Sequence, residues 1–82
     1  MIQYYKVLKI ETNLPIYWKI EEGNPPRVQW LGQNSNDWYT FYHESSTVTG
    51  AISSVKRQFG LMLIFITEEE YEKEMMLMEL IK

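Results

Sequence analysis

The sequence contains one histidine, His43, and its neighbour Glu44 is the nearest carboxylate along the chain. A histidine oriented by a carboxylate is a common general base in enzymes. Adjacent residues of a strand point to opposite faces, so Glu44 is poorly placed to orient the ring if this segment is extended. No accompanying nucleophile or set of oxyanion donors can be identified. We therefore predict no catalytic residues and no enzymatic activity.

Metal and phosphate sites have equally little support in the sequence. Without cysteine and with one histidine, only oxygen ligands remain, and a hard cation needs several of them in one place. The loop at residues 34–37 has oxygen donors but lacks the acidic alternation and final glutamate of a calcium-binding loop. The glycines stand apart and form no phosphate-binding motif. We predict neither a metal nor a cofactor.

Length and composition indicate one small globular domain over residues 1–82. The chain is 45% hydrophobic and 23% charged, close to the globular average, which disfavours disorder. The absence of cysteine excludes a disulfide scaffold and suits a reducing compartment. No signal peptide is visible, and the longest apolar run, residues 61–66, is far shorter than the roughly 20 residues of a membrane-spanning helix. We expect a soluble, cytoplasmic protein that does not contact a membrane.

Four segments in the first half of the chain have the composition or the alternation of β-strands. The Gly-Asn-Pro-Pro stretch at residues 23–26 and the polar loop at residues 32–37 separate the later ones. Short connections between successive strands favour an antiparallel meander. The four predicted strands are residues 3–11, 16–21, 27–31 and 38–43.

Two further elements follow in the second half of the chain. Apolar residues recur at spacings of three and four over residues 48–59, which predicts an amphipathic helix. N-cap candidates precede it at residues 45–47, and Gly60 is placed to end it in the left-handed conformation. The wholly apolar run 61–66 then predicts a strand that is buried on both faces.

A second helix is predicted over residues 68–81. Thr67 and Glu70 form a capping box, in which the hydroxyl and the carboxylate each satisfy a backbone donor. The acidic stretch at residues 68–74 places negative charge at the positive end of the helix dipole. A dense carboxylate surface can also imitate DNA phosphates, but capping and solubility already explain these charges.

The expected element order is therefore β-β-β-β-α-β-α, which defines an α+β fold. We predict an antiparallel sheet of about five strands, with both helices packed on one face. The fifth strand is expected to insert beside a central partner.

Aromatic residues are concentrated in the first half of the chain, which holds nine of the twelve. Rings on a sheet face can stack nucleic acid bases or bind another protein, although filling a small core is the commonest use. Charge disfavours nucleic acid as the partner. Residues 1–66 have six basic and five acidic groups, a net +1, whereas residues 67–82 have two basic and six acidic groups, a net −4.

The last predicted helix has more apolar surface than one sheet-facing stripe requires. An arc that begins at Tyr71 can face the sheet, whereas Met76, Leu77 and Leu80 lie beside or beyond it. Burying these side chains takes the other helix, a second copy of the chain or a target. Methionine suits adaptable interfaces because its side chain is flexible and polarizable.

These patterns predict a non-enzymatic protein–protein interaction domain that self-associates, with a homodimer as the simplest assembly. An accessory or inhibitory role is expected if the partner is another protein, and such a domain would suit a virus or a mobile element. The alternative is a nucleic-acid-binding or nucleic-acid-mimicking protein that uses sheet aromatics or the acidic helix. The predicted interaction surface consists of Trp38, Tyr39, Phe41, Met76, Leu77 and Leu80.

Overall fold

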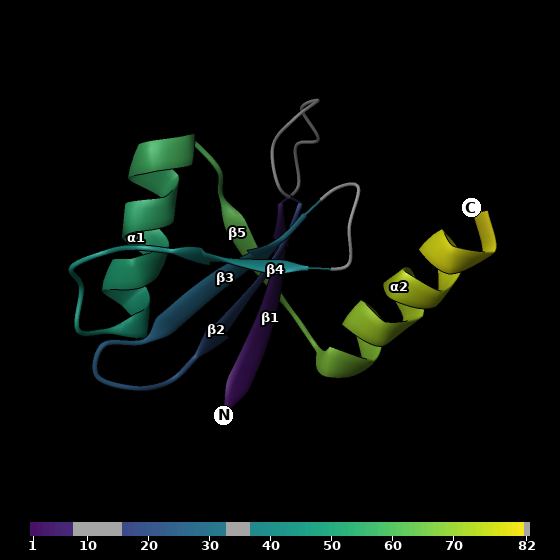
Figure 1. Ribbon diagram of the computed structural model, residues 1–82, viewed down its shortest axis with the longest axis horizontal. Helices are drawn as coiled ribbons and strands as arrows, with labels where there is room; N and C mark the ends of the chain where they lie inside the picture. Colours follow the sequence, from purple (N-terminus) through teal and green to yellow (C-terminus); the bar gives the residue numbers. More distant parts are fainter. Residues whose placement is uncertain (8–15, 33–36, 82) are drawn as a thin grey trace.

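The computed structural model describes residues 1–7, 16–32 and 37–81. Within these residues, five strands form one sheet in the order β4-β3-β2-β1-β5, and all neighbouring strands are antiparallel. The predicted α+β class and the order β-β-β-β-α-β-α are confirmed (Figure 1). The elements are β1 (Ile2–Val7), β2 (Tyr17–Glu21), β3 (Arg27–Leu31), β4 (Trp38–Phe41), α1 (Val48–Phe59), β5 (Leu63–Ile66) and α2 (Glu68–Ile81).

Both helices and β3 have the predicted boundaries, whereas β2, β4 and β5 are shorter than expected. The segment predicted at 38–43 forms a strand over Trp38–Phe41, and the described part of the segment predicted at 3–11 lies within β1, Ile2–Val7. Residues 8–15 and 33–36, where the rest of the first strand and two predicted turns fall, lie outside the described residues. The hairpin between β3 and β4 closes through a 3.0 Å hydrogen bond from the Gly32 amide to the Asp37 carbonyl.

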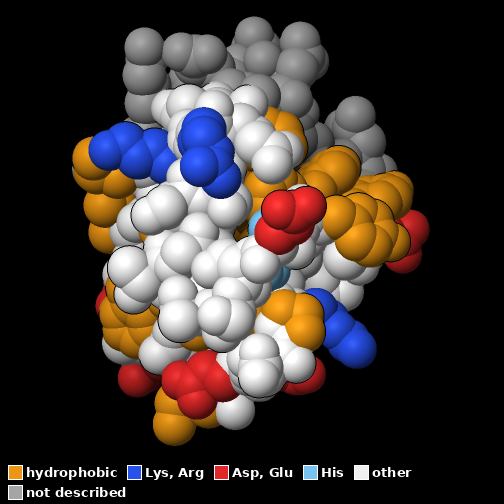
Figure 2. Space-filling view, turned by 90° about the vertical axis from the view of Figure 1, so that its left-hand side faces the viewer, with side chains coloured by type: hydrophobic (Ala, Val, Ile, Leu, Met, Phe, Trp, Pro, Cys, Tyr) orange, Lys and Arg blue, Asp and Glu red, His pale blue; other side chains and the backbone are white. Residues whose placement is uncertain are grey.

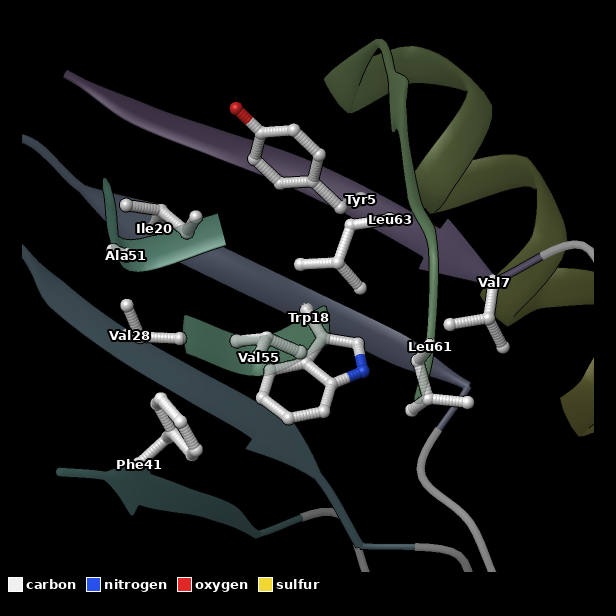
Figure 3. Close-up of a cluster of buried hydrophobic side chains, with 10 residues drawn as sticks. All are labelled: Tyr5, Val7, Trp18, Ile20, Val28, Phe41, Ala51, Val55, Leu61 and Leu63. Carbon is white, nitrogen blue, oxygen red and sulfur yellow. The ribbon is translucent and has the colours of Figure 1, made fainter. Parts of the chain in front are cut away.

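The main core lies between the sheet and α1. In β2, Trp18 and Ile20 are fully buried, and Ile20 is opposite the equally buried Val28 of β3. Ala51 and Val55 of α1 cover these strands from above (Figure 3). Burial of such side chains supplies the main driving force for folding. The complete cluster is Tyr5, Val7, Trp18, Ile20, Val28, Phe41, Ala51, Val55, Leu61 and Leu63.

Both ends of α1 follow the prediction. The Thr47 hydroxyl accepts a 3.1 Å hydrogen bond from the Gly50 amide, as an N-cap residue does. Gly60 has φ 69° and donates its amide to the Lys56 carbonyl at 2.8 Å. Glycine has no Cβ and adopts this left-handed conformation without strain, so Gly60 ends the helix and turns the chain toward β5.

The capping box of α2 is present with one difference. The Thr67 hydroxyl accepts a 3.1 Å hydrogen bond from the Glu70 amide, as predicted. The Glu70 carboxylate accepts a 3.3 Å hydrogen bond from that hydroxyl instead of from the Thr67 amide. The first turn of α2 is thus fixed by side chains that are local in sequence.

The two helices lie on opposite faces of the sheet, whereas the sequence analysis placed them on one face (Figure 1). The Phe59 ring of α1 packs 5.5 Å from Trp18, and the Tyr71 ring of α2 packs 6.0 Å from Tyr17. Tyr17 and Trp18 are adjacent in β2, so their side chains point to opposite faces. The strands carry aromatic rings on both faces, and each face therefore needs its own helix.

The fifth strand lies at an edge of the sheet, not between other strands. β5 pairs with β1, from Tyr4 opposite Ile66 to Val7 opposite Leu63. Leu63 and Ile66 are buried as predicted, but Phe65 is 56% exposed. The physical reason is that β5 is an edge strand of the described sheet, so the Phe65 ring has a neighbouring strand, with the Tyr5 ring 5.8 Å away, on one side only. No helix within the described residues is long and apolar enough to cross a membrane.

We expect Gly60→Ala to lower the free energy of unfolding by about 1–2 kcal/mol, because an alanine in the left-handed conformation is strained. A Cβ at this position meets nothing within 4 Å, so the loss reflects the backbone alone. Gly60→Asn is the matched control and should lose less, since asparagine tolerates this conformation. Urea denaturation of the three proteins checks this, and an unchanged midpoint for Gly60→Ala would contradict it.

Candidate interaction surfaces

His43 joins two parts of the backbone and has no geometry for catalysis. Its Nδ1 accepts a 3.1 Å hydrogen bond from the Ser45 amide, which places the ring proton on Nε2. Nε2 then donates to the Pro26 carbonyl at 2.8 Å. Since the backbone occupies both ring nitrogens, neither is available to take a substrate proton. His43 instead ties the start of β3 to the segment that leads into α1.

A hollow of about 530 Å³ lies beside His43. The Ser54 hydroxyl in its wall donates to the Gly50 carbonyl at 3.1 Å and accepts from Arg57 at 3.4 Å. These hydrogen bonds fix the local structure and leave no serine paired with a base. Within the part of the chain that the structure describes, no three acidic, histidine or cysteine side chains converge as metal ligands would. The hollow is lined by Tyr42, His43, Glu44, Ser45, Ser54, Arg57 and Gln58.

The outer face of α1 is polar. Thr49, Ser53 and Lys56 are exposed on this helix, and Arg57 follows in its last turn. Figure 2 views the molecule from this side and shows mostly uncoloured polar side chains and backbone, with hydrophobic groups toward the margins. This face offers little apolar area to a partner.

The opposite face of the sheet holds a group of four rings, here called the Tyr71 cluster: Tyr4, Tyr17, Trp38 and Tyr71. Tyr71 stacks on Tyr4 with ring centres 4.4 Å apart, and it lies 6.1 Å from Trp38. The Lys19 ammonium sits 4.3 Å from the centre of the Trp38 ring, in a cation–π contact. The first half of α2 is therefore held to the sheet by aromatic contacts.

Glu74 adds polar contacts next to the Tyr71 cluster. Its carboxylate accepts hydrogen bonds from Lys6 at 3.1 Å and from the Tyr17 hydroxyl at 3.2 Å. Burial, together with the negative charge and hydrogen bond of Glu74, raises the pKa of Tyr17 to about 12. Burial also raises the pKa of Tyr71, with a smaller contribution from Tyr4. Both tyrosines are therefore neutral over the whole physiological range.

This arrangement disfavours the nucleic-acid alternative on the α2 side of the sheet. A stacking platform needs open rings in a basic groove, but the rings of the Tyr71 cluster pack on one another. Carboxylates also border them, since Glu68 and Glu72 contribute to the raised pKa of Tyr4 after burial. Phosphate groups would meet negative charge here.

The three predicted residues of β4 do not form one surface. Trp38 is half-buried in the Tyr71 cluster, whereas Tyr39 lies on the α1 side, stacked 4.7 Å from Trp30 and 45% exposed. Phe41, predicted to be at the surface, is only 7% exposed. The register places Phe41 opposite Val28, beneath α1, which removes it from the candidate interface.

The predicted α2 residues are placed differently. Met76 and Leu77 are 63% and 59% exposed. Tyr71, Glu74 and Met75 are half-buried toward the sheet, so the spacing of the helix directs residues 76 and 77 away from it. The structure brings these two together on the outer side of α2 and separates them from Trp38 and Tyr39. The side chain of Leu80 lies outside the described ones.

A further apolar surface, from which the sequence analysis chose no site residues, lies at the edge formed by β5. Met62 and Phe65 are 57% and 56% exposed there. The order of the elements could have indicated this surface. Once four strands have formed a meander, a later strand can join the sheet at one of its two edges without separating paired strands. Comparisons with known protein families, with curated proteins and with solved structures found no match to this chain.

The raised pKa of Tyr17 makes stability fall as pH rises from about 10 to about 12. Over this range the native state retains the Tyr17 proton, whereas the unfolded chain, with an ordinary tyrosine pKa of 10.0, loses it. Below pH 10 both states are protonated and the contribution is complete. Glu74→Gln should lower the pKa of Tyr17 and make the loss shallower, whereas Glu69→Gln should not. Tyrosinate absorbance and urea denaturation across the range test this, and ionisation of Tyr17 near pH 10 would contradict it.

The different burial of two neighbouring rings gives a further prediction. Phe41→Ala should lower the free energy of unfolding by about 3 kcal/mol because it opens a cavity against Trp18 and Phe59. Tyr39→Ala should lower it by about 1 kcal/mol, the value of one partly exposed ring pair. Urea denaturation compares them, and equal losses would show that Phe41 is not a core residue.

Proposed function

We propose that this protein is a non-enzymatic interaction domain that self-associates through the outer side of α2. The observation that supports this best is the exposure of Met76 and Leu77, at 63% and 59%, on a helix whose other side already packs on the sheet. Neighbouring large apolar side chains on a helix surface favour burial against a second surface. The two are adjacent in sequence, so one partner element can cover both.

A second copy of α2 suits this surface, because antiparallel pairing separates the acidic ends of the helices. If the two helices cross between Met76 and Leu77, Glu69 of each copy lies seven to eight residues from the crossing point. At 1.5 Å per residue, the two Glu69 positions are about 22 Å apart along the axis. Repulsion between these first-turn carboxylates is weak at that separation, since the screening length is about 8 Å at physiological salt. Glu72, Glu74 and Glu79 lie closer to the crossing point.

The same surface could bind a different protein, and the role is then accessory or inhibitory, by steric occupation. The described surface offers apolar area for contact. Among its residues, no nucleophile is paired with a base. In this proposal the domain acts in the cytosol, because a chain without cysteine needs no oxidising compartment.

We expect Met76→Glu combined with Leu77→Glu to reduce the average mass of the assembly at a given concentration by about half, as a dimer contact is lost. The introduced carboxylates repel each other across a symmetric interface, and the apolar area that Met76 and Leu77 bury there is lost. Light scattering over a wide concentration range measures this, and circular dichroism confirms that helix content is retained.

Thr49→Glu combined with Ser53→Glu is the matched control. It adds the same charge to an exposed helix face, on α1, and should leave the average mass unchanged. A monomeric unmodified protein, or equal masses for the unmodified protein and the α2 variant, would refute self-association through α2.

A further inference from the structure

We infer that the open edge of β5 is a second self-association site, at which β5 of another copy pairs antiparallel and continues the sheet. This site goes beyond the α2 surface and is separate from it. α2 lies on one face of the sheet, whereas the open side of β5 lies in the plane of the strands (Figure 1).

The first step is the backbone of β5. One side of Leu63–Ile66 pairs with β1, and among the residues that the structure describes no strand lies on the other side. Backbone N–H and C=O groups of a strand point alternately to its two sides, so an edge strand presents a row of them outward. Another extended strand satisfies such a row best, which defines the chemistry of the partner.

The second step is the lack of protection at this edge. Natural edge strands are shielded by charged residues, proline or a bulge. Residues 61–66 contain no charge and no proline, and the continuous register with β1 leaves no bulge within Leu63–Ile66. The other edge strand, β4, begins directly after Asp37. Met62 and Phe65 add exposed apolar area at the β5 edge.

The third step identifies the partner strand as β5 itself. Across a two-fold axis perpendicular to the sheet, opposed residues belong to the same face. A register centred on Phe65 places Ile64 opposite Ile66 of the second copy, and one centred on Ile64 places Phe65 opposite Leu63. In both registers these central pairs match apolar side chains with apolar side chains, so the middle of the edge is complementary to itself.

Charge also permits two copies to meet here, although each chain has a formal charge of −3. The nearest carboxylate after β5 is Glu68, and the register centred on Phe65 places it opposite Met62 of the second copy. The two Glu68 positions are then six residues apart, about 20 Å along the strands. This exceeds the screening length of about 8 Å, so the acidic starts of the two α2 helices oppose pairing only weakly.

Single cysteines test the pairing directly, because the natural chain has none. In the two symmetric registers either residue 64 or residue 65 lies opposite its own copy, within the range of Cα separations that a disulfide spans. We expect Ile64→Cys or Phe65→Cys to form a disulfide-linked dimer under mild oxidation at least about tenfold faster than Tyr39→Cys, since geometry limits the reaction. Tyr39 is the matched control: an exposed aromatic residue on the other edge strand.

Leu77→Cys, measured in parallel, separates this inference from the proposed function. Cross-linking of Leu77→Cys alone would overturn the β5 site and leave the α2 surface standing. Cross-linking of a β5 variant alone would support the β5 site and count against the α2 surface. Rates for both β5 variants equal to that of Tyr39→Cys would overturn the inference.

A second variant tests the same edge without a covalent bond. In the background of Met76→Glu and Leu77→Glu, which removes the α2 contact, Phe65→Lys should convert the remaining dimer to monomer. Paired lysines at a symmetric edge repel each other and forfeit the apolar contact. Tyr39→Lys in the same background should leave the dimer intact. A dimer that persists with Phe65→Lys, with unchanged circular dichroism, would contradict the inference.

Discussion

The arrangement of this protein depends on the alternation of side chains along its strands. Aromatic rings occupy both odd- and even-numbered positions of these strands, so rings point to both faces of the sheet. Tyr17 and Trp18 are consecutive in β2, so one ring must lie on each face of the sheet. A sheet with both helices on one side would leave the other set of rings in water. α1 therefore covers the face of Trp18, α2 covers the face of Tyr17, and the chain has no further element within its described residues to cover an edge.

The two faces are covered in different ways, and this difference explains why α2 keeps an open apolar side. Beneath α1, fully buried aliphatic and aromatic side chains interlock, with Val55 and Trp18 both at 0% exposure. Beneath α2, the contacts are the rings around Tyr71 and the partly exposed ion pair of Lys6 and Glu74. An exposed pair of this kind contributes about 0–1 kcal/mol, so the rings dominate. They hold the first half of α2, and Met76 and Leu77 point outward beyond them.

Local features of the sequence predicted the helices and strands. The face of the sheet that each helix covers depends instead on contacts between residues that are distant in sequence. The caps at Thr47, Gly60 and Thr67 set the helix boundaries, because capping is decided within a few residues. The sides taken by the helices and the burial of Phe41 depend on strand register. Register is poorly specified by a pattern when both faces of a strand are apolar. The exposure of Met76 and Leu77 agrees with the expected surplus of apolar surface on α2, since that surplus follows from helical spacing alone.

The small size of the chain limits how much apolar surface the fold can bury by itself. A chain of 82 residues buries only about 64% of its unfolded surface. The two helices of the described residues lie on the two faces of the sheet, and no other helix or strand among those residues covers the edge of β5 or the outer side of α2. In the proposed assembly a second copy covers these surfaces through isologous contacts, in which one patch meets its own equivalent and no new complementary surface is needed. The two apolar surfaces and the opposite placement of the helices therefore have a common origin in the ring pattern of the strands.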